Sequence, residues 1–539
     1  MMTNSLKADL VLLGGKVITV DKVFSIAQAV AVQNGRILAV GKDSEIKDWI
    51  GPETKVIRLE GKTVVPGFND SHMHPIIYGM DLLKVNCGSP PNRSIKDVLD
   101  KIKKATEKAP PGTWINCSEY KHLLLEEKRV ITRWDLDPVA PHHPVLLPTI
   151  HALSLNSLAL KIAGITKETR DPDGGHIDKD PNTGEPTGMV YEKAVKPVLG
   201  FVPPPKREDY AQALGLVSAE LLKEGITSVE EAGGVEEFDN RTLFRAYQDA
   251  RKAGVWRVRA YIMMTIHSLK DVEEVKDFGF YTGFGDDWMK IGPIKTFMDG
   301  SFTMRKAAIY EPPVDGNLGI LTWGKEELKQ AVNQLHQMGW QICAHAQGDR
   351  GIDLLLDAYE EALKEFPRKN HRHRVEHGGI STPAVQDRYK KLDVVVTSQP
   401  NLLHFFGANF RFYGPERSRW MYPYKTLLSR GIVVSGGSDC RATPFPPPLG
   451  IWSAVNRIEK NSGEVLIPEE RISITEALKM YTIHGAYASF EEEVKGSIEP
   501  GKFADMVVLD RDPLSIDPQE LREMRVLHTI LGGEVVYSA

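Results

Sequence analysis

The sequence has 539 residues, of which 42% are hydrophobic and 26% charged, an ordinary globular composition that excludes a disordered chain, a collagen and a coiled coil. Its net charge of −5 excludes non-specific binding to nucleic acid, and no apolar run approaches the length of a membrane-spanning helix. Four scattered cysteines do not make a disulfide framework, and the first residues lack the apolar core of a signal peptide. We therefore expect a cytoplasmic protein with no nucleic-acid or membrane partner.

Both ends of the chain are predicted to be rich in short β-strands. Residues 8–20 and 29–40 contain apolar runs, and Asn34-Gly35 in the second is a strong hairpin signal because both turn residues need a positive φ. The runs at 504–510 and 526–537 are similar. We expect residues 1–65 and 495–539 to form one composite β-sandwich domain. Two separate β modules are the weaker alternative, because each would have few strands to bury.

The middle of the chain, residues 66–494, alternates short β-branched runs with helical stretches, which predicts a parallel sheet. Eight such runs predict an α/β fold, a (β/α)8 TIM barrel whose functional groups lie at the C-terminal ends of the strands. The expected strands are residues 63–69, 225–231, 257–264, 289–298, 341–345, 372–377, 394–399 and 432–439. The chain between the first two is far too long for one loop, so we expect a large insert after barrel strand 1, at about residues 86–205.

Histidines at the ends of the expected barrel strands indicate a metal site. His72 and His74 follow the first strand, and side chains two apart on a strand point the same way. This pair alone is weak evidence, because two solvated histidines in a loop give the same pattern. Later strands add four candidates at equivalent positions, namely Lys295, His345, His377 and Asp439. Imidazole and carboxylate together suit zinc and similar divalent ions.

Further motifs are spread over nearly the whole chain. They include the segment around His72 and His74, the order His, His, Asp on strands five, six and eight, and the run that begins at Ala504. A His-x-x-x-x-Asn-Ser motif begins at His151, and a Gly-Glu-Pro-Thr-Gly run occupies 184–188. With these motifs the sequence resembles the amidohydrolase superfamily, and within it the amidohydrolase 3 branch that contains N-substituted formamide deformylases.

This resemblance implies a binuclear metal centre, most simply two Zn²⁺ per chain. His72, His74 and Asp439 would hold the more buried ion, and His345 and His377 the other. Lys295 would bridge them as a carbamate derived from carbon dioxide, since an ammonium beside two cations is disfavoured and the neutral amine can react. The alternative for Lys295 is an ordinary lysine paired with Asp299, which leaves a single-metal site possible.

Together with these ligands, the resemblance implies a hydrolase that cleaves the C–N bond of a small linear amide with an apolar substituent. Two close cations generate hydroxide from water, and Asp439 acts as the general base that passes the proton to the leaving nitrogen. His151 completes the predicted catalytic set of Asp439, Lys295 and His151, although a structural histidine is equally compatible. One rival is a mononuclear deaminase of a cyclic amidine, whose relatives place Glu where this chain has Gly348. The other is a non-catalytic regulatory protein on the same scaffold.

The predicted substrate-binding residues are His151, Asp299, Gln347, Phe405 and Trp420. The last two belong to an aromatic-rich loop after strand seven that would cover an apolar group, or else form a subunit interface or internal packing. Glu376 is predicted to point away from the metal, either paired with Arg374 or facing a helix. The expected partner is the small-molecule amide itself, and a homodimer is compatible with the sequence.

Overall fold

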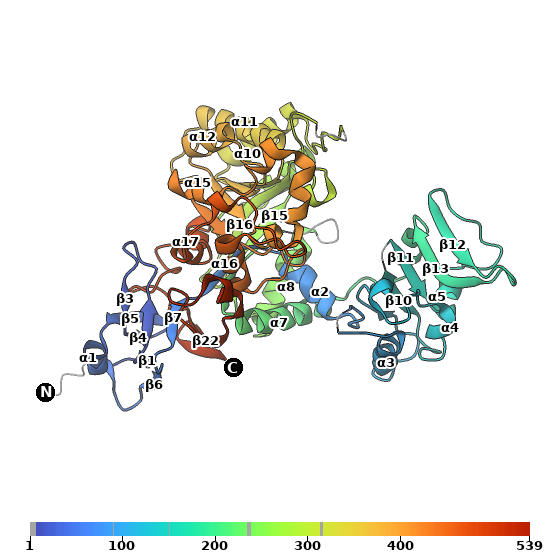
Figure 1. Ribbon diagram of the computed structural model, residues 1–539, viewed down its shortest axis with the longest axis horizontal. Coiled ribbons are helices and arrows are strands. Elements are labelled where there is room, and N and C mark those ends of the chain that lie inside the picture. The colour runs from blue at the N-terminus through green and yellow to red at the C-terminus, as the bar shows by residue number, and fades with distance from the viewer. Residues whose placement is uncertain (1–6, 90, 150, 234–238, 313–315) are drawn as a thin grey trace. The chain divides into compact units, whose positions relative to one another are not determined.

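The computed structural model describes residues 7–89, 91–149, 151–233, 239–312 and 316–539 (Figure 1). The chain divides into two compact units, one made of Met1–Pro75 and Ser218–Ala539, the other of Ile76–Val217. Within the described ranges, no helix combines the length and the apolar character that crossing a membrane requires.

The first unit contains a barrel of parallel strands, which confirms the predicted (β/α)8 fold. The strands lie in the order β20-β19-β18-β17-β16-β15-β14-β8, and neighbours are parallel. Their bounds are β8 Phe68–Met73, β14 Ile226–Glu231, β15 Arg259–Thr265, β16 Met289–Phe297, β17 Ile342–Ala346, β18 Arg374–His377, β19 Val395–Ser398 and β20 Val434–Gly436. Helices alternate with them: α7 Arg207–Lys223, α8 Asn240–Lys252, α9 Leu269–Lys276, α10 Lys325–Gln337, α11 Asp349–Glu365, α12 Pro383–Lys391, α15 Tyr424–Ser429, α16 Pro447–Asn456, α17 Ile474–Met480 and α18 Ile483–Ala488.

The ring of strands closes where the chain leaves β8 and β20. The backbone N–H of Asp439 donates to the carbonyl of His72 at 2.7 Å, and that of His74 donates to the carbonyl of Cys440 at 2.9 Å. A Cβ on Gly437 would lie 2.6 Å from the backbone nitrogen of His72, so this approach requires glycine. Closure therefore fixes the backbone that carries three of the predicted metal ligands.

A β-sandwich in the same unit is built from both ends of the chain. One sheet has the order β5-β4-β1-β6 and the other β23-β22-β21-β7-β2-β3. Their bounds are β1 Leu10–Leu13, β2 Lys16–Ile18, β3 Ile26–Ala27, β4 Ala29–Gln33, β5 Arg36–Gly41, β6 Lys55–Arg58, β7 Thr63–Pro66, β21 Met506–Leu509, β22 Val526–Leu531 and β23 Glu534–Ser538. Leu12, Val64, Val508 and Ile530 pack in one core, and blue β7 and red β22 of Figure 1 belong to one sheet, with β21 between them.

The first barrel strand differs from the expectation of 63–69. That segment splits at Gly67: Thr63–Pro66 is β7 of the sandwich, and the barrel strand begins at Phe68. A Cβ on Gly67 would lie 2.1 Å from Oγ1 of Thr227, so the chain passes close to β14 as it crosses from sandwich to barrel. The shift places His72 inside β8 rather than beyond its end.

The second unit, Ile76–Val217, is wider than the expected 86–205. It has a five-stranded sheet in the order β12-β13-β11-β10-β9. Its elements are α2 Pro75–Leu82, α3 Ile95–Thr106, β9 Ile115–Asn116, α4 Arg133–Leu136, β10 Val145–Thr149, β11 Ala152–Leu155, α5 Ser157–Ile162, β12 Gly175–Lys179, β13 Pro186–Glu192 and α6 Val195–Leu199. Two apolar clusters, one around Leu147 and one around Leu155, form its core.

Candidate metal centre

Three side chains meet where β8 and β20 end. His72 lies in β8 and His74 follows two residues later, so both rings project toward the C-terminal end of the barrel. Asp439 has a positive φ of 54°, which makes a sharp turn after β20, and the hydrogen bond from its backbone to His72 holds that turn. The spacing of His72 and His74 along the chain and the contact that closes the barrel between β8 and the end of β20 together bring the three side chains into one cluster.

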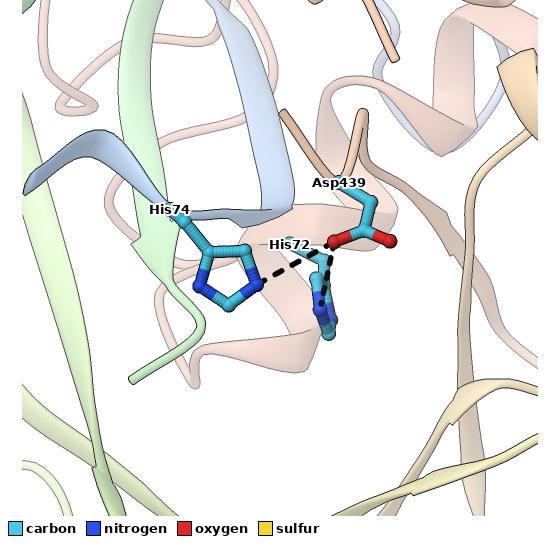
Figure 2. A group of neighbouring side chains, drawn as sticks. All are labelled: His72, His74 and Asp439. Atoms are coloured by element: carbon cyan, nitrogen blue, oxygen red, sulfur yellow. Dashed lines mark ion pairs between the residues drawn. The ribbon is translucent and has the colours of Figure 1, made fainter. Parts of the chain in front are cut away.

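The cluster has the dimensions of a metal site. Ligand atoms of His72, His74 and Asp439 all lie within 4.8 Å of one another. Oδ1 of Asp439 is 3.5 Å from Nε2 of His74 and 3.8 Å from Nε2 of His72, and Figure 2 shows the two rings and the carboxylate pointing toward one another. The side chain of His72 is 1% exposed, whereas those of His74 and Asp439 are 14% and 19% exposed. His72 is thus enclosed by the protein, whereas His74 and Asp439 are partly accessible to solvent.

The other two predicted histidines adjoin this cluster. The ring of His377 lies 4.9 Å from that of His72, and the ring of His345 lies 4.4 Å from that of His377, measured between centroids. His345 belongs to β17, and His377 ends β18 with a positive φ of 72°. The structure therefore brings all four predicted histidines into one group.

Lys295 is buried in β16, 1% exposed, and burial lowers its pKa. Among the residues that the structure describes, no carboxylate forms an ion pair with its Nζ. The pairing with Asp299 that the sequence left open is not formed. The Asp299 carboxylate instead accepts backbone N–H groups of Ala308, Gln347 and Gly348 at 2.9, 3.0 and 2.7 Å.

In three of the histidines, Nδ1 contacts an oxygen atom on the side of the ring that faces away from the cluster. The partners are the Glu376 carboxylate for His72, the Gly233 carbonyl at 3.1 Å for His74, and Oε1 of Gln399 at 2.6 Å for His377. In each case Nδ1–H donates a hydrogen bond to the oxygen, which leaves the Nε2 lone pair available. Histidines that bind metal ions are held in this way, so the residues present fit a divalent cation.

Electrostatics favour the ligand forms of these side chains. Burial lowers the pKa of His72 and of His345 well below the usual range, and that of His377 to about 3. Burial opposes ionisation of Asp439, but the hydrogen bond with His74 and the nearby imidazoles lower its pKa overall. The same carboxylate raises the pKa of His74 against the effect of burial.

Glu376 is the functional residue that sequence reasoning missed. Its predicted ion pair with Arg374 is present, with Nε and Oε1 2.7 Å apart, but the prediction that Glu376 points away from the site is wrong. Both side chains lie inside the barrel, fully buried, and Glu376 contacts His72. The available signal was the spacing, because residues two apart share a strand face and an arginine in a strand of the barrel needs an acid.

Two of the predicted substrate-binding residues hold loops. Asp299, after β16, binds the backbone of the turn after β17 as described above. Gln347 is buried, and its Oε1 accepts the backbone N–H of Phe302 at 3.0 Å. Asp299 also lies beside a predicted metal ligand, with its Oδ1 3.7 Å from Nε2 of His345. Contact of either residue with a substrate stays a prediction.

The predicted aromatic residues are half-buried. Phe405 packs against the ring of His404 at 4.9 Å. Trp420 lines a cavity of about 530 Å³ together with Thr426 and Glu470, and the lining of that cavity includes none of the predicted metal ligands. Contact of either residue with a substrate remains a prediction.

His151 belongs to the second unit, in the turn between β10 and β11, with a positive φ of 55°. Its side chain is 73% exposed, and its Nδ1 lies 3.5 Å from Oε1 of Glu192. Its catalytic and substrate-binding roles remain predictions.

Comparisons with known proteins find similarity along nearly the whole chain. A model of the amidohydrolase family matches residues 55–537. The protein YtcJ of Bacillus subtilis is 31% identical, over 97% of this chain and 98% of its own length. An N-substituted formamide deformylase of Arthrobacter pascens is 30% identical, over 98% of both chains. A crystal structure of an uncharacterized metal-dependent hydrolase from Pyrococcus furiosus has a TM-score of 0.74 at 25% identity, covering 94% of this chain and all of its own.

Deaminases match a smaller part of the sequence. A 5-methylthioadenosine/S-adenosylhomocysteine deaminase of Teredinibacter turnerae is 24% identical over 35% of this chain.

Proposed function

Since the chain belongs to the amidohydrolase family, we propose that it is a metal-dependent hydrolase that cleaves the C–N bond of a small linear amide. The observation that carries this proposal is the convergence of His72, His74 and Asp439, with two further histidines and a buried lysine beside them. Such a set at the C-terminal end of a barrel is suited to hydrolysis.

The proposed arrangement assigns His72, His74 and Asp439 to one ion and His345 and His377 to a second. Bound divalent cations, zinc by preference, would acidify a water molecule and polarise the amide carbonyl. Lys295 would bridge the two positions as a carbamate. Its burial, with no acidic side chain paired to it in the described part of the chain, supports this role. A neutral amine can attack carbon dioxide, form an N–C bond and release a proton.

Asp439 is proposed to move the proton. Its carboxylate is ionised, partly exposed and directed into the site, so it can accept a proton from the attacking water. It would then deliver that proton to the leaving nitrogen, which departs poorly as an amide anion. His74 restrains the Asp439 carboxylate through the contact at 3.5 Å.

An apolar substituent on the amide is supported by Phe297 at the end of β16. Its ring is half-buried, with its centroid 5.9 Å from that of His345 and 5.0 Å from Nζ of Lys295. An aromatic face so close to the polar cluster offers an apolar group a surface while the amide is held at the centre. The formamide deformylase relative agrees with a substituted amide as substrate class.

The deaminase alternative is opposed by Gly348. Deaminases of the superfamily are expected to carry Glu at this position, but here a Cβ would lie 1.8 Å from the carbonyl oxygen of Ala308. The backbone leaves no room for any side chain, so this chain offers no acid at that place.

The test combines a metal count with a substrate screen. Elemental analysis of protein purified without chelators is expected to give two divalent ions per chain, and N-formyl, N-acetyl and aryl amides are then assayed for release of acid and amine. Hydrolysis of a linear amide that disappears on chelation supports the proposal. Release of ammonia from a cyclic amidine, with one ion, would favour the deaminase. A metal-free, inactive protein would leave a regulatory role.

A further inference from the structure

The three histidines that are supported from behind do not have equal partners. Nδ1 of His74 bonds a backbone carbonyl, with the Glu231 carboxylate farther away at 3.9 Å, and that of His377 bonds the neutral amide of Gln399. His72 alone of the three has a carboxylate, that of Glu376, in direct hydrogen-bond contact. A carboxylate partner on one ring nitrogen fixes the tautomer and raises the basicity of the other nitrogen. Nε2 of His72 should therefore be the strongest imidazole donor of the group.

Glu376 is itself held rigidly. Arg374 donates to it twice, from Nε at 2.7 Å and from Nη2 at 3.1 Å. The same guanidinium donates to Glu230 of β14 and, at 2.9 Å, to the carbonyl of Ser71. All of these side chains are at most 1% exposed. Glu376 therefore has one available orientation, with its second oxygen on His72.

The group formed by Arg374, Glu376 and Glu230, called the clamp below, also connects three strands beneath the metal centre. Arg374 and Glu376 come from β18, Glu230 from β14, and Ser71 is the neighbour of His72 in β8. The Arg374 guanidinium pairs with two carboxylates, so the three side chains of the clamp together carry no net positive charge. Its position and its charge both favour a cation bound by His72.

We propose that Glu376 is a positioning residue that makes the place built from His72, His74 and Asp439 the tighter of two metal positions, filled first. This inference rests on the proposed function, since it requires that the centre binds divalent ions. It goes beyond the ligand set, because it assigns the order of binding to a residue that touches no ion.

The decisive experiment is a Zn²⁺ titration of metal-free protein in competition with a chromophoric chelator, repeated with Co²⁺ to follow its visible spectrum. Wild-type protein is expected to show one tight and one weaker step. Glu376→Gln keeps the shape and removes the charge, and should weaken the tight step by about 10–100-fold while leaving the weaker step in place. The Co²⁺ spectrum of the tight step should change with it.

Two matched variants separate positioning from general damage. Gln399→Leu removes the contact behind His377 and should weaken only the second step. Ser228→Ala alters a hydroxyl that Lys495 contacts in the same barrel interior at 3.1 Å, and should change neither step. Should Glu376→Gln fail to fold, wild type is compared with His72→Asn and His377→Asn. The first is expected to lose the tight ion and the second to retain it, and the reverse pattern would overturn the inference.

The results also distinguish the two proposals. Wild-type protein that binds no ion would reject the metal-dependent function. Two binding steps in the wild type, with the tight step unchanged in folded Glu376→Gln, would reject only the role of Glu376.

Discussion

Asp439 is the residue on which the proposed proton transfer depends. Asp439→Asn keeps an oxygen ligand but cannot accept a proton, and the loss of a general base typically lowers kcat by about 10²–10⁴-fold. We expect metal content close to wild type and almost no turnover, measured by elemental analysis and amide hydrolysis on the same sample. Near wild-type activity would show that another group handles the proton.

Lys295 gives a second prediction at this scale. Lys295→Ala should lose metal and activity together, and formate, acetate or propionate should restore part of both by supplying a free carboxylate between the ions. Lys290→Ala is the matched control, since Lys290 lies in the same strand but pairs with Glu491 at 2.8 Å. Equal responses of the two variants to added acid would argue against the carbamate.

At the level of elements, the contact between β8 and the end of β20 decides whether the centre forms. Gly437→Ala would push a methyl group against the backbone of His72, at 2.6 Å before relaxation, and should destabilise the fold by about 1–3 kcal/mol. We expect a lower Tm and weaker metal binding together. Gly324→Ala, whose Cβ would meet nothing closer than 3.9 Å, is the control. Metal affinity equal to wild type in Gly437→Ala would show that closure is not needed.

A second contact between elements makes stability depend on pH. Burial opposes the charge of Glu491, but Lys495 at 2.6 Å and Lys290 at 2.8 Å lower its pKa from 4.5 to about 2. The lowered pKa contributes up to about 3 kcal/mol to the free energy of unfolding. This contribution is fully present above pH 4.5 and is lost as the pH falls toward 2.

The free energy of unfolding of Glu491→Gln should therefore vary less over that range than that of wild type, as measured by urea denaturation. Glu416→Gln, in an exposed pair with Arg419, should follow wild type. If the free energy of unfolding changed with pH in the same way in all three proteins, this pH dependence could not be assigned to Glu491.

For the whole molecule, the shared sandwich predicts that fragment 1–65 does not fold alone. β7 lies between β2 and β21, so removing the C-terminal strands leaves one edge of β7 unpaired and exposes the core around Val64. Circular dichroism of the fragment should show no cooperative melting, and co-expression with 495–539 should improve its solubility. A fragment that melts cooperatively alone would refute the composite domain.

The sequence was sufficient for the barrel and for the residues that converge in it, because ligands at the ends of parallel strands must gather at one end. Alternation counted from His377 gave the wrong direction for Glu376, and only its spacing from Arg374 carried a signal. If side chains alternated strictly between the two faces of β18, an inward His377 would put Glu376 on the outer face. His377 has a positive φ, however, which breaks the alternation and lets both side chains face inward. The split at Gly67 was also hidden, since the apolar run continues across it and only contact with Thr227 marks the crossing.

The antiparallel pairing of Val65 with Val507 has a consequence for biosynthesis. On a ribosome, β7 emerges early but must wait until the entire barrel has been made before its neighbour β21 appears, an interval of tens of seconds at ordinary translation rates. During that interval an unpaired edge and an apolar face are open to solvent or to chaperones. Because β8 begins just after β7, the strand that carries His72 gains its final anchor only near the end of translation. A nascent chain halted inside the barrel would therefore lack a completed centre.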